Sequence, residues 1–409
     1  MATAACQSSG SGEESAGGPS VAAGASQEDY IEALADAEPI EIVLQMPTPP
    51  DNPFTTPGDE YAKAVEQWSG GKITFDVSYS GAIAALPEMG KALGDGLVDM
   101  GIHRPEYMQD SFPVATYFGK YLSIHEADPI VGNLQLFGAL GQIWSDTDAL
   151  WEEAEEVGIR PLVPATATGS AAMLCRGEPL TSLAAAKGIS IRSQTPAGAA
   201  LIDHLGASAV SLPQNELYEA AQRGVVDCME ASFGLLSTAG LADVTDGWTV
   251  DPTAGPAPVT GFDMSLDKWE SLPLAAQQLL WDRLDVYLES YLMVGQWGSN
   301  ALAVEDSNEA GLAWEDWDAE AAADIEGFWE QYRESVADEA VDGRDGEADL
   351  VEVEAAHEKW LGIVRDDLGF EAEVGWGDFD SWYAAHEDAI DFKPLIEVYV
   401  DEILMPHRP

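Results

Sequence analysis

Apolar and polar positions in the N-terminal quarter of the chain change between a strand period and a helix period. Residues 41–46 are an apolar run that a proline-rich loop must end, and residues 73–79 alternate apolar and polar side chains. The spacing predicts strands at 41–46, 73–79 and 98–102 and helices at 59–68 and 87–94. Short helices between apolar strands predict an α/β sheet in this half of the chain.

The same alternation returns in the middle of the chain. It predicts strands at 171–175, 189–192, 209–212 and 225–227 and helices at 183–187, 196–205 and 215–223. From Pro273 onward the pattern changes to long acidic helices, such as 318–337, and 369–409 follows as an appended segment. The tryptophans of these helices are expected to anchor apolar faces in the core: Trp314, Trp317, Trp329 and Trp360.

A sheet in each half also predicts where a ligand would bind. In open α/β sheets the ligand lies beyond the carboxyl ends of the strands. Arg104, Arg192 and Glu230 fall at such positions. We therefore take these three side chains as the first candidates for a binding site.

Composition adds two constraints. The chain has 409 residues, 46% of them hydrophobic, which suits two lobes better than one. It carries 73 acidic residues against 18 Lys and Arg, a net charge of −55, which argues against nucleic acid as a partner. Such charge favours a saline habitat, where salt screens the repulsion; the alternative is an acidic surface on an ordinary secreted protein.

Cysteine usage points to the outside of the cell. Cys6 follows small residues in TAAC and precedes a Ser/Gly/Ala/Glu-rich stretch, which resembles a bacterial lipoprotein cleavage site with its flexible tether. No apolar run is long enough to span a bilayer, so an acylated Cys6 would be the only membrane anchor. The alternative is an unstructured N-terminus with an incidental cysteine.

Signatures of enzyme chemistry are missing from the sequence. It contains no P-loop, HExxH, GxSxG or dinucleotide-binding glycine pattern, and its six histidines are scattered. The three cysteines have no metal-site spacing. The sequence therefore predicts a protein that is not an enzyme and contains no signature of a cofactor or metal site; whether a metal ion bridges a ligand stays open.

Arg192 is unusual because basic residues are rare in this chain. It ends the apolar strand GISIR at residues 188–192. A guanidinium buried there without an anion would cost several kcal/mol, so a carboxylate must meet it. That carboxylate belongs either to a ligand, which a guanidinium holds through two parallel hydrogen bonds, or to one of the many Asp and Glu residues.

Several motifs in a fixed order extend this interpretation. They are PDNP at 50–53, AVEQWSGGKI at 64–73, LGDGLVDMG at 93–101, PLTSLAAAKGISIR at 179–192, LGA at 205–207, LPQNELYEAAQRGVVD at 212–227 and KWESLP at 268–273. Together they resemble the substrate-binding proteins of TRAP (tripartite ATP-independent periplasmic) transporters. The resemblance covers roughly residues 40–339.

The resemblance implies a two-lobed periplasmic-binding-protein fold, type II-like, with a hinge, a long connecting helix and an extra C-terminal helical segment. The expected parts are a tether at 1–38, lobe I at 39–165 plus about 252–300, lobe II at 166–251 plus part of 301–345, and a C-terminal helical extension at 346–409. Such a protein closes on a small organic carboxylate, delivers it to a sodium-driven membrane permease and does no chemistry on it.

The resemblance also assigns roles at the site. Arg192 matches the family arginine that pairs with the ligand carboxylate. The asparagine that follows the glutamate in many carboxylate-binding members is Ala231 here, and the tryptophan of oxo-acid binders that use a metal is absent. Glu230 is expected to hold a ligand hydroxyl, amine or cation, or else to fix Arg192.

Three further residues are candidates for the cleft. Phe233 supplies an apolar wall or is a core side chain. Arg104 adds a second positive contact or lies on the surface, and Asn52 lies in a loop that borders the cleft in the family.

Cys175 and Cys228 both fall in the second lobe, where an oxidising compartment permits a disulfide; two free thiols are the alternative. Two other functions remain open at this point: a secreted hydrolase or lyase on a two-lobed scaffold, and a sensor subunit that presents its ligand to a receptor.

Overall fold

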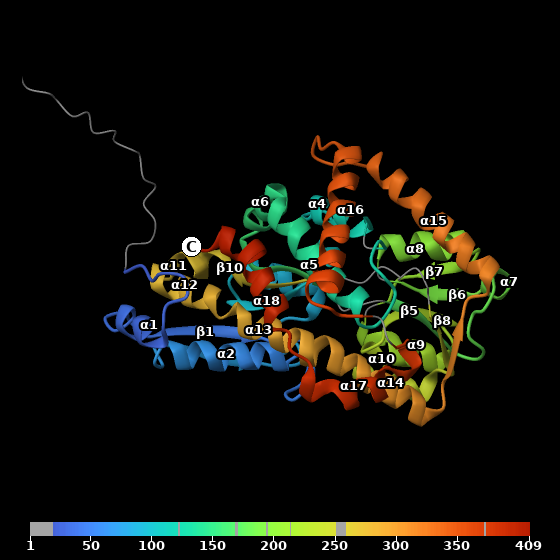
Figure 1. The fold of residues 1–409 in the computed structure, drawn as a ribbon, viewed down its shortest axis with the longest axis horizontal. Coiled ribbons are helices and arrows are strands. Elements are labelled where there is room, and N and C mark those ends of the chain that lie inside the picture. Colours follow the sequence, from blue (N-terminus) through green and yellow to red (C-terminus); the bar gives the residue numbers. More distant parts are fainter. Residues whose placement is uncertain are drawn as a thin grey trace, which may run out of the picture.

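The computed structural model describes residues 19–121, 123–167, 171–193, 195–212, 214–250, 259–371 and 374–409. Within these residues the strands form a five-stranded sheet of order β2-β1-β3-β10-β4 and a six-stranded sheet of order β11-β9-β5-β8-β6-β7. Each sheet with its helices forms one lobe, called here the first and the second lobe (Figure 1). The predicted two-lobed α/β fold is confirmed.

The strands are β1 Ile40–Gln45, β2 Ile73–Ser78, β3 Met100–His103, β4 Ile159–Ala167, β5 Ala171–Cys175, β6 Ser190–Arg192, β7 Ser208–Val210, β8 Cys228–Ser232, β9 Gly247–Val250, β10 Val259–Ser265 and β11 Ala313–Asp316. The helices before the connecting helix are α1 Gln27–Ala33, α2 Thr56–Trp68, α3 Met89–Gly94, α4 Pro113–Phe118, α5 Val131–Asp146, α6 Asp148–Glu156, α7 Leu183–Ala186, α8 Pro196–His204, α9 Leu217–Arg223, α10 Leu235–Thr238, α11 Leu266–Ser271 and α12 Leu274–Asp282. The remaining helices are α13 Leu284–Ser290, the π-helix η6 Tyr291–Gly298, α14 Ser299–Ala310, α15 Ala319–Ala337, α16 Gly346–Gly362, α17 Phe379–His386 and α18 Lys393–Tyr399.

The first sheet contains all three strands expected from the N-terminal pattern. β1 runs parallel to β2 and β3, and Ile42 and Leu44 on one face of β1 are fully buried. Antiparallel β10 pairs with both β3 and β4 and completes the sheet. Periodicity did not predict β4 or β10. Nearly every residue of both strands is buried, β4 does not alternate apolar with polar residues, and the alternation of β10 is confined to Phe262–Ser265.

The second sheet has a helix-covered core on each face. Within β5, Leu174 packs toward α9 and α10, while Met173 packs toward α8 and α15, as the period of two requires. The strand expected at 225–227 was placed too early, since β8 begins at Cys228. Gly224 ends α9 with a left-handed φ of 70°, and the chain needs the residues after it to return to the sheet.

A disulfide joins Cys175 of β5 to Cys228 of β8. These residues are direct partners in the antiparallel register, and their Cα atoms are 4.0 Å apart. The pairing that the sequence left open is therefore confirmed. It holds together the two strands at the centre of the second lobe.

One continuous helical stretch connects the lobes. It comprises α13, η6 and α14, residues 284–310. α13 packs on α2 of the first lobe, and α14 packs on α10 of the second. This is the long connecting helix that the resemblance predicts (Figure 1).

The C-terminal helices α16 and α18 pack into the core of the first lobe. Trp360 of α16 is fully buried against α5, where a Cβ on Gly138 would lie 2.0 Å from its ring. Tyr399 of α18 packs in the same way against Gly141. In Figure 1, α16 and α18 lie beside α5 and α13. The domain boundaries given above stay a prediction.

Three of the four tryptophans expected in the core are buried: Trp317, Trp329 and Trp360. Trp314 is only partly buried. Among the described residues, no helix is long and apolar enough to cross a membrane. The proposed lipidation site Cys6 lies outside the described residues.

Candidate ligand-binding site

A cavity of about 620 Å³ lies between the lobes and is lined by both. The first lobe contributes side chains near the ends of β1 and β3, and the second contributes side chains from β6, β8 and the turns that follow them. Tyr291 and Gly295 of the connecting helix also line it. The cavity therefore lies beyond the carboxyl ends of parallel strands, where this class of sheet binds ligands.

Arg192 is buried in the wall of this cavity, with 2% of its surface exposed. Its Nε donates to the carbonyl of Leu212 at 3.2 Å, and its Nη1 donates to the carbonyl of Glu230 at 3.1 Å. Its Nη2 has no hydrogen-bond partner among the described residues. Two backbone carbonyls thus fix the orientation of the guanidinium and leave part of its donor set unused.

Most arginines of the chain pair with a carboxylate. Within the part of the chain that the structure describes, six do so: Arg160, Arg223, Arg283, Arg344, Arg365 and Arg408. Arg192 and Arg104 are both buried, and neither forms an ion pair with any residue that the structure describes. The internal salt bridge considered for Arg192 is therefore not present among the described residues.

Arg192 nevertheless remains a cation at neutral pH. Burial lowers the pKa of Arg192 to about 10, while the charge of Glu230 acts in the opposite direction and that of Arg104 adds to the lowering. A pKa of about 10 still leaves the guanidinium protonated at pH 7. The cavity wall therefore presents a fixed positive charge.

Glu230 lies in β8 next to Arg192 and is 6% exposed. Its Oε2 accepts a hydrogen bond from the hydroxyl of Ser193. The start of α8 approaches it closely, since a Cβ on Gly198 would lie 2.2 Å from Oε2. Contacts within the second lobe therefore position this carboxylate, and its charge favours the protonated form of Arg192.

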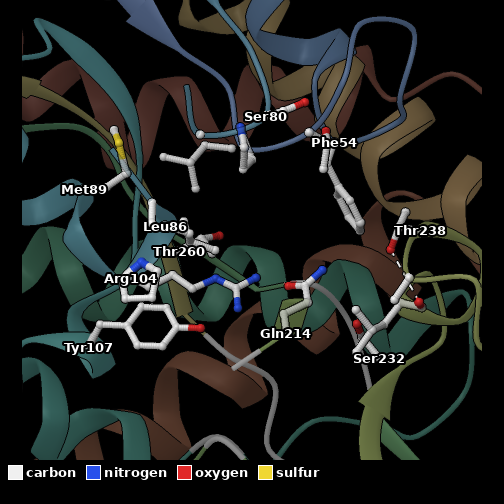
Figure 2. A pocket seen from close by; sticks show the side chains of 18 of the residues that line it. Phe54, Ser80, Leu86, Met89, Arg104, Tyr107, Gln214, Ser232, Thr238 and Thr260 are labelled. Carbon is white, nitrogen blue, oxygen red and sulfur yellow. Dashed lines mark hydrogen bonds between the residues drawn. The ribbon is translucent and has the colours of Figure 1, made fainter. Parts of the chain in front are cut away.

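Arg104 follows β3 of the first lobe and faces the cavity, so it is not a surface residue. Figure 2 shows its guanidinium, the hydroxyl of Tyr107 and the amide of Gln214 directed toward the middle of the cavity. Sequence reasoning missed Tyr107 and Gln214, although Gln214 lies in a motif that carried the resemblance. The Arg104 side chain thus meets residues of the second lobe across the cavity.

The other two candidates do not line the cavity. Phe233 is 1% exposed and stacks on Trp376, with ring centroids 3.9 Å apart, so it is a core side chain. Asn52 accepts a hydrogen bond from the backbone N–H of Phe54 at 3.0 Å. Phe54 does line the cavity, so Asn52 shapes the loop that places this ring.

Two lobes, a connecting helix and an interlobar cavity define the class of two-lobed periplasmic binding proteins. Residues 45–312 match the family model DctP, described as bacterial extracellular solute-binding protein, family 7. This match spans more than half of the chain, and the protein belongs to that family. The family predicted from the motifs is confirmed, and its description is one of solute binding, which does not favour a hydrolase or lyase.

Solved structures share the fold at low sequence identity. A TRAP solute-binding protein from a marine metagenome, in complex with 3-hydroxybenzoate, is 18% identical over 79% of this chain and 99% of that chain, with a TM-score of 0.67. A TRAP solute-binding protein from Rhodoferax ferrireducens, with copurified benzoate, is 15% identical over 79% and 99%, with a TM-score of 0.68. A sugar acid binding protein from Advenella mimigardefordensis, with galactonate, is 17% identical over 80% and 100%, with a TM-score of 0.66.

Proposed function

We propose that this protein captures a small organic carboxylate outside the cytoplasm and delivers it to the membrane subunits of a TRAP-type permease. The observation that carries the proposal is the guanidinium of Arg192. It is buried at the cavity wall, oriented by two carbonyls and without an ion-pair partner among the described residues. A ligand carboxylate supplies the anion that such a buried cation requires.

The two arginines also link binding to closure. Arg192 belongs to the second lobe and Arg104 to the first, and their like charges oppose each other across the cavity. A carboxylate between them replaces this repulsion with attraction to both lobes. The ligand therefore adds contacts that only the closed arrangement makes, which is what a binding protein needs to shift its population.

The other candidate residues have supporting roles in this proposal. Glu230 maintains the charge and orientation of Arg192. Asn52 and Phe233 act from behind the wall, Asn52 through Phe54 and Phe233 through the turn that follows β8. The bound molecules named for the compared structures, 3-hydroxybenzoate, benzoate and galactonate, are all carboxylates, and they support the same ligand class here.

The proposal includes the location of the protein. We expect an acylated Cys6 to anchor it on the outer side of a membrane, supported by the TAAC sequence and the tether-like composition after it. Mass spectrometry of the native protein checks this, and an unmodified Cys6 would exclude the anchor. The net charge of −55 supports a saline habitat, and stability that does not change up to molar salt would contradict it.

A thermal-shift screen of organic acids in high salt tests the function. Saturating ligand stabilises the folded state by RT ln(1 + [L]/Kd), so a bound acid raises the midpoint by a few degrees. Arg192→Ala is expected to lose this shift. Arg223→Ala is the matched control, because Arg223 lies in the same lobe with an exposed side chain, and it should keep the shift. A full shift in Arg192→Ala would exclude the proposed clamp.

The same geometry would serve a sensor subunit that presents its ligand to a signalling receptor. Adjacent genes for a small and a large membrane subunit support transport, whereas an adjacent receptor gene supports sensing.

A further inference from the structure

The cavity has a charged side and an apolar side. Figure 2 shows Arg104, Tyr107 and Gln214 on one side and Phe54 and Leu86 on the other. Further apolar lining residues are Pro47, Pro57, Ala84, Ala85, Pro87 and Met89 of the first lobe. A ligand that fills the cavity therefore meets polar groups at one end and carbon surface at the other.

Several polar side chains in the wall have already used their hydrogen-bonding groups. The Gln45 amide accepts from the N–H groups of Ile83 and Ala84 at 2.7 and 3.0 Å and donates to the carbonyl of Ala84 at 2.7 Å. The hydroxyl of Thr48 bonds to that of Thr55 at 2.6 Å. These groups line the cavity, yet they have little capacity left for a ligand hydroxyl.

The same holds at two other points of the wall. Thr238 donates to the carbonyl of Gly234 at 2.9 Å, and Thr260 shares a hydrogen bond with Thr166 at 2.8 Å. Tyr291 likewise donates to the carbonyl of Ala167, and the other lining hydroxyls belong to Ser80, Tyr107, Thr195, Tyr218 and Ser232. The apolar side at Pro47, Pro57 and residues 84–87 has no side-chain hydroxyl to pair with hydroxyls of a ligand. Each ligand hydroxyl left unpaired weakens binding about tenfold or more.

Charge in the lining also limits the ligand to one anionic group. Besides the two arginines, Glu216 and Glu230 line the second lobe. A second carboxylate on the ligand would find no further cation among the described lining residues and would be repelled by these glutamates. The site is therefore built for a single carboxylate.

Phe54 indicates the nature of the apolar part. The chain has 11 phenylalanines, and every one except Phe54 contacts another aromatic ring among the described residues. Phe54 instead projects into the cavity with its side chain partly exposed. An aromatic body on the ligand would give this ring the stacking partner that the other phenylalanines have.

We infer that the ligand is an aromatic monocarboxylate, whose carboxylate meets Arg192 and Arg104 and whose ring packs against Phe54 and the apolar side of the first lobe. The cavity of about 620 Å³ is much larger than an acid of two or three carbons requires, and it accommodates such a body. Phe54 is then the residue that determines specificity. This inference rests on the proposed function, because it presupposes that a carboxylate binds at Arg192.

Calorimetric titration of the full chain at high salt tests the inference. Benzoate is the aromatic probe, succinate the dicarboxylate and gluconate the polyhydroxylated acid. We expect benzoate to bind at least a hundredfold more tightly than either. We expect Phe54→Ala to weaken benzoate at least tenfold, and Ile83→Ala, an exposed apolar control in the same lobe, to leave it unchanged.

The outcomes separate the two proposals. If succinate or gluconate binds more tightly than benzoate and depends on Arg192, the proposed function stands and the aromatic inference is wrong. If no acid binds to folded protein, the proposed function fails together with the inference. Phe54→Leu, which keeps an apolar side chain, guards against misfolding of the alanine variant; benzoate affinity unchanged in both variants would exclude the role of Phe54.

Discussion

Trp376 connects the C-terminal segment to both lobes, and its removal gives a sharp prediction. Its ring stacks on Phe233 of the second lobe at 3.9 Å with an interplanar angle of 18°. Its Nε1 donates to the carbonyl of Ala127, just before α5 of the first lobe, at 2.8 Å. Phe233 lies between Ser232 and Leu235, which both line the cavity. Trp376 thus supports the cavity wall from behind.

The cost of Trp376→Ala follows from these contacts. A buried tryptophan truncated to alanine costs about 3–5 kcal/mol, which includes the lost ring contact and the lost hydrogen bond. In a chain of this size, 1 kcal/mol lowers the unfolding midpoint by roughly 2 °C, so we expect a loss of roughly 6–10 °C. Trp376→Phe keeps a ring that can stack but loses the hydrogen bond and part of the buried indole, so its loss should be smaller, about 1–3 kcal/mol.

Thermal unfolding followed by circular dichroism measures these shifts. Val351→Ala is the matched control, because Val351 lies in the same C-terminal segment and is 64% exposed, so its effect should stay within about 0.5 kcal/mol. Ligand affinity should also fall in Trp376→Ala and recover in Trp376→Phe. A midpoint for Trp376→Ala no lower than that of Val351→Ala would refute the reasoning.

Three other predictions concern the core. Gly138→Ala places a Cβ 2.0 Å from the ring of Trp360 and should cost about 1–3 kcal/mol, measurable by urea unfolding; wild-type stability would contradict the packing of α16 on α5. Burial lowers the pKa of His357 to about 3, so below pH 6.5 the unfolded chain binds a proton that the folded chain does not. The free energy of unfolding should therefore keep the full contribution of neutral His357 above pH 6.5. It should fall as the pH drops below 6.5, by up to about 1.4 kcal/mol per pH unit. The free energy of unfolding, measured with urea between pH 7.5 and pH 5, should depend less steeply on pH in His357→Leu than in the wild type. The same pH dependence in both proteins would refute this. Reducing the Cys175–Cys228 disulfide, which spans a sequence separation of 53, should cost about 4 kcal/mol in the chain-entropy account, and an unchanged urea midpoint with reductant would contradict it.

The fold was predictable from sequence where one face of an element meets water. β1 and β2 were found because their patterns carry a strand signal, whereas β4 is buried on both faces and gives no alternation. The C-terminal helices have apolar faces, but only the structure shows that the helix α5 leaves room for Trp360 at Gly138. Sequence patterns predict that a face is buried and do not identify its partner.

The site was predictable where a residue type is rare for its setting. Arg192 was found because a basic residue at the end of an apolar strand is unusual in so acidic a chain. Phe54 and Tyr107 were missed because aromatic residues in loops have no period and no distinctive chemistry. Phe233 follows the cavity-lining Ser232 directly, yet its side chain points into the core, and sequence does not fix that direction.

The affinity of Arg192 variants for the tightest-binding organic acid tests the central claim most directly. Truncating one member of a buried charge pair costs about 2–5 kcal/mol, so Arg192→Ala should weaken binding from about thirtyfold to several thousandfold. Arg192→Lys keeps the charge but loses the planar pair of donors, so its affinity for the acid should lie between that of the wild type and that of Arg192→Ala. If calorimetry shows that folded Arg192→Ala binds the acid as tightly as the wild type, Arg192 does not hold the ligand and the account is wrong.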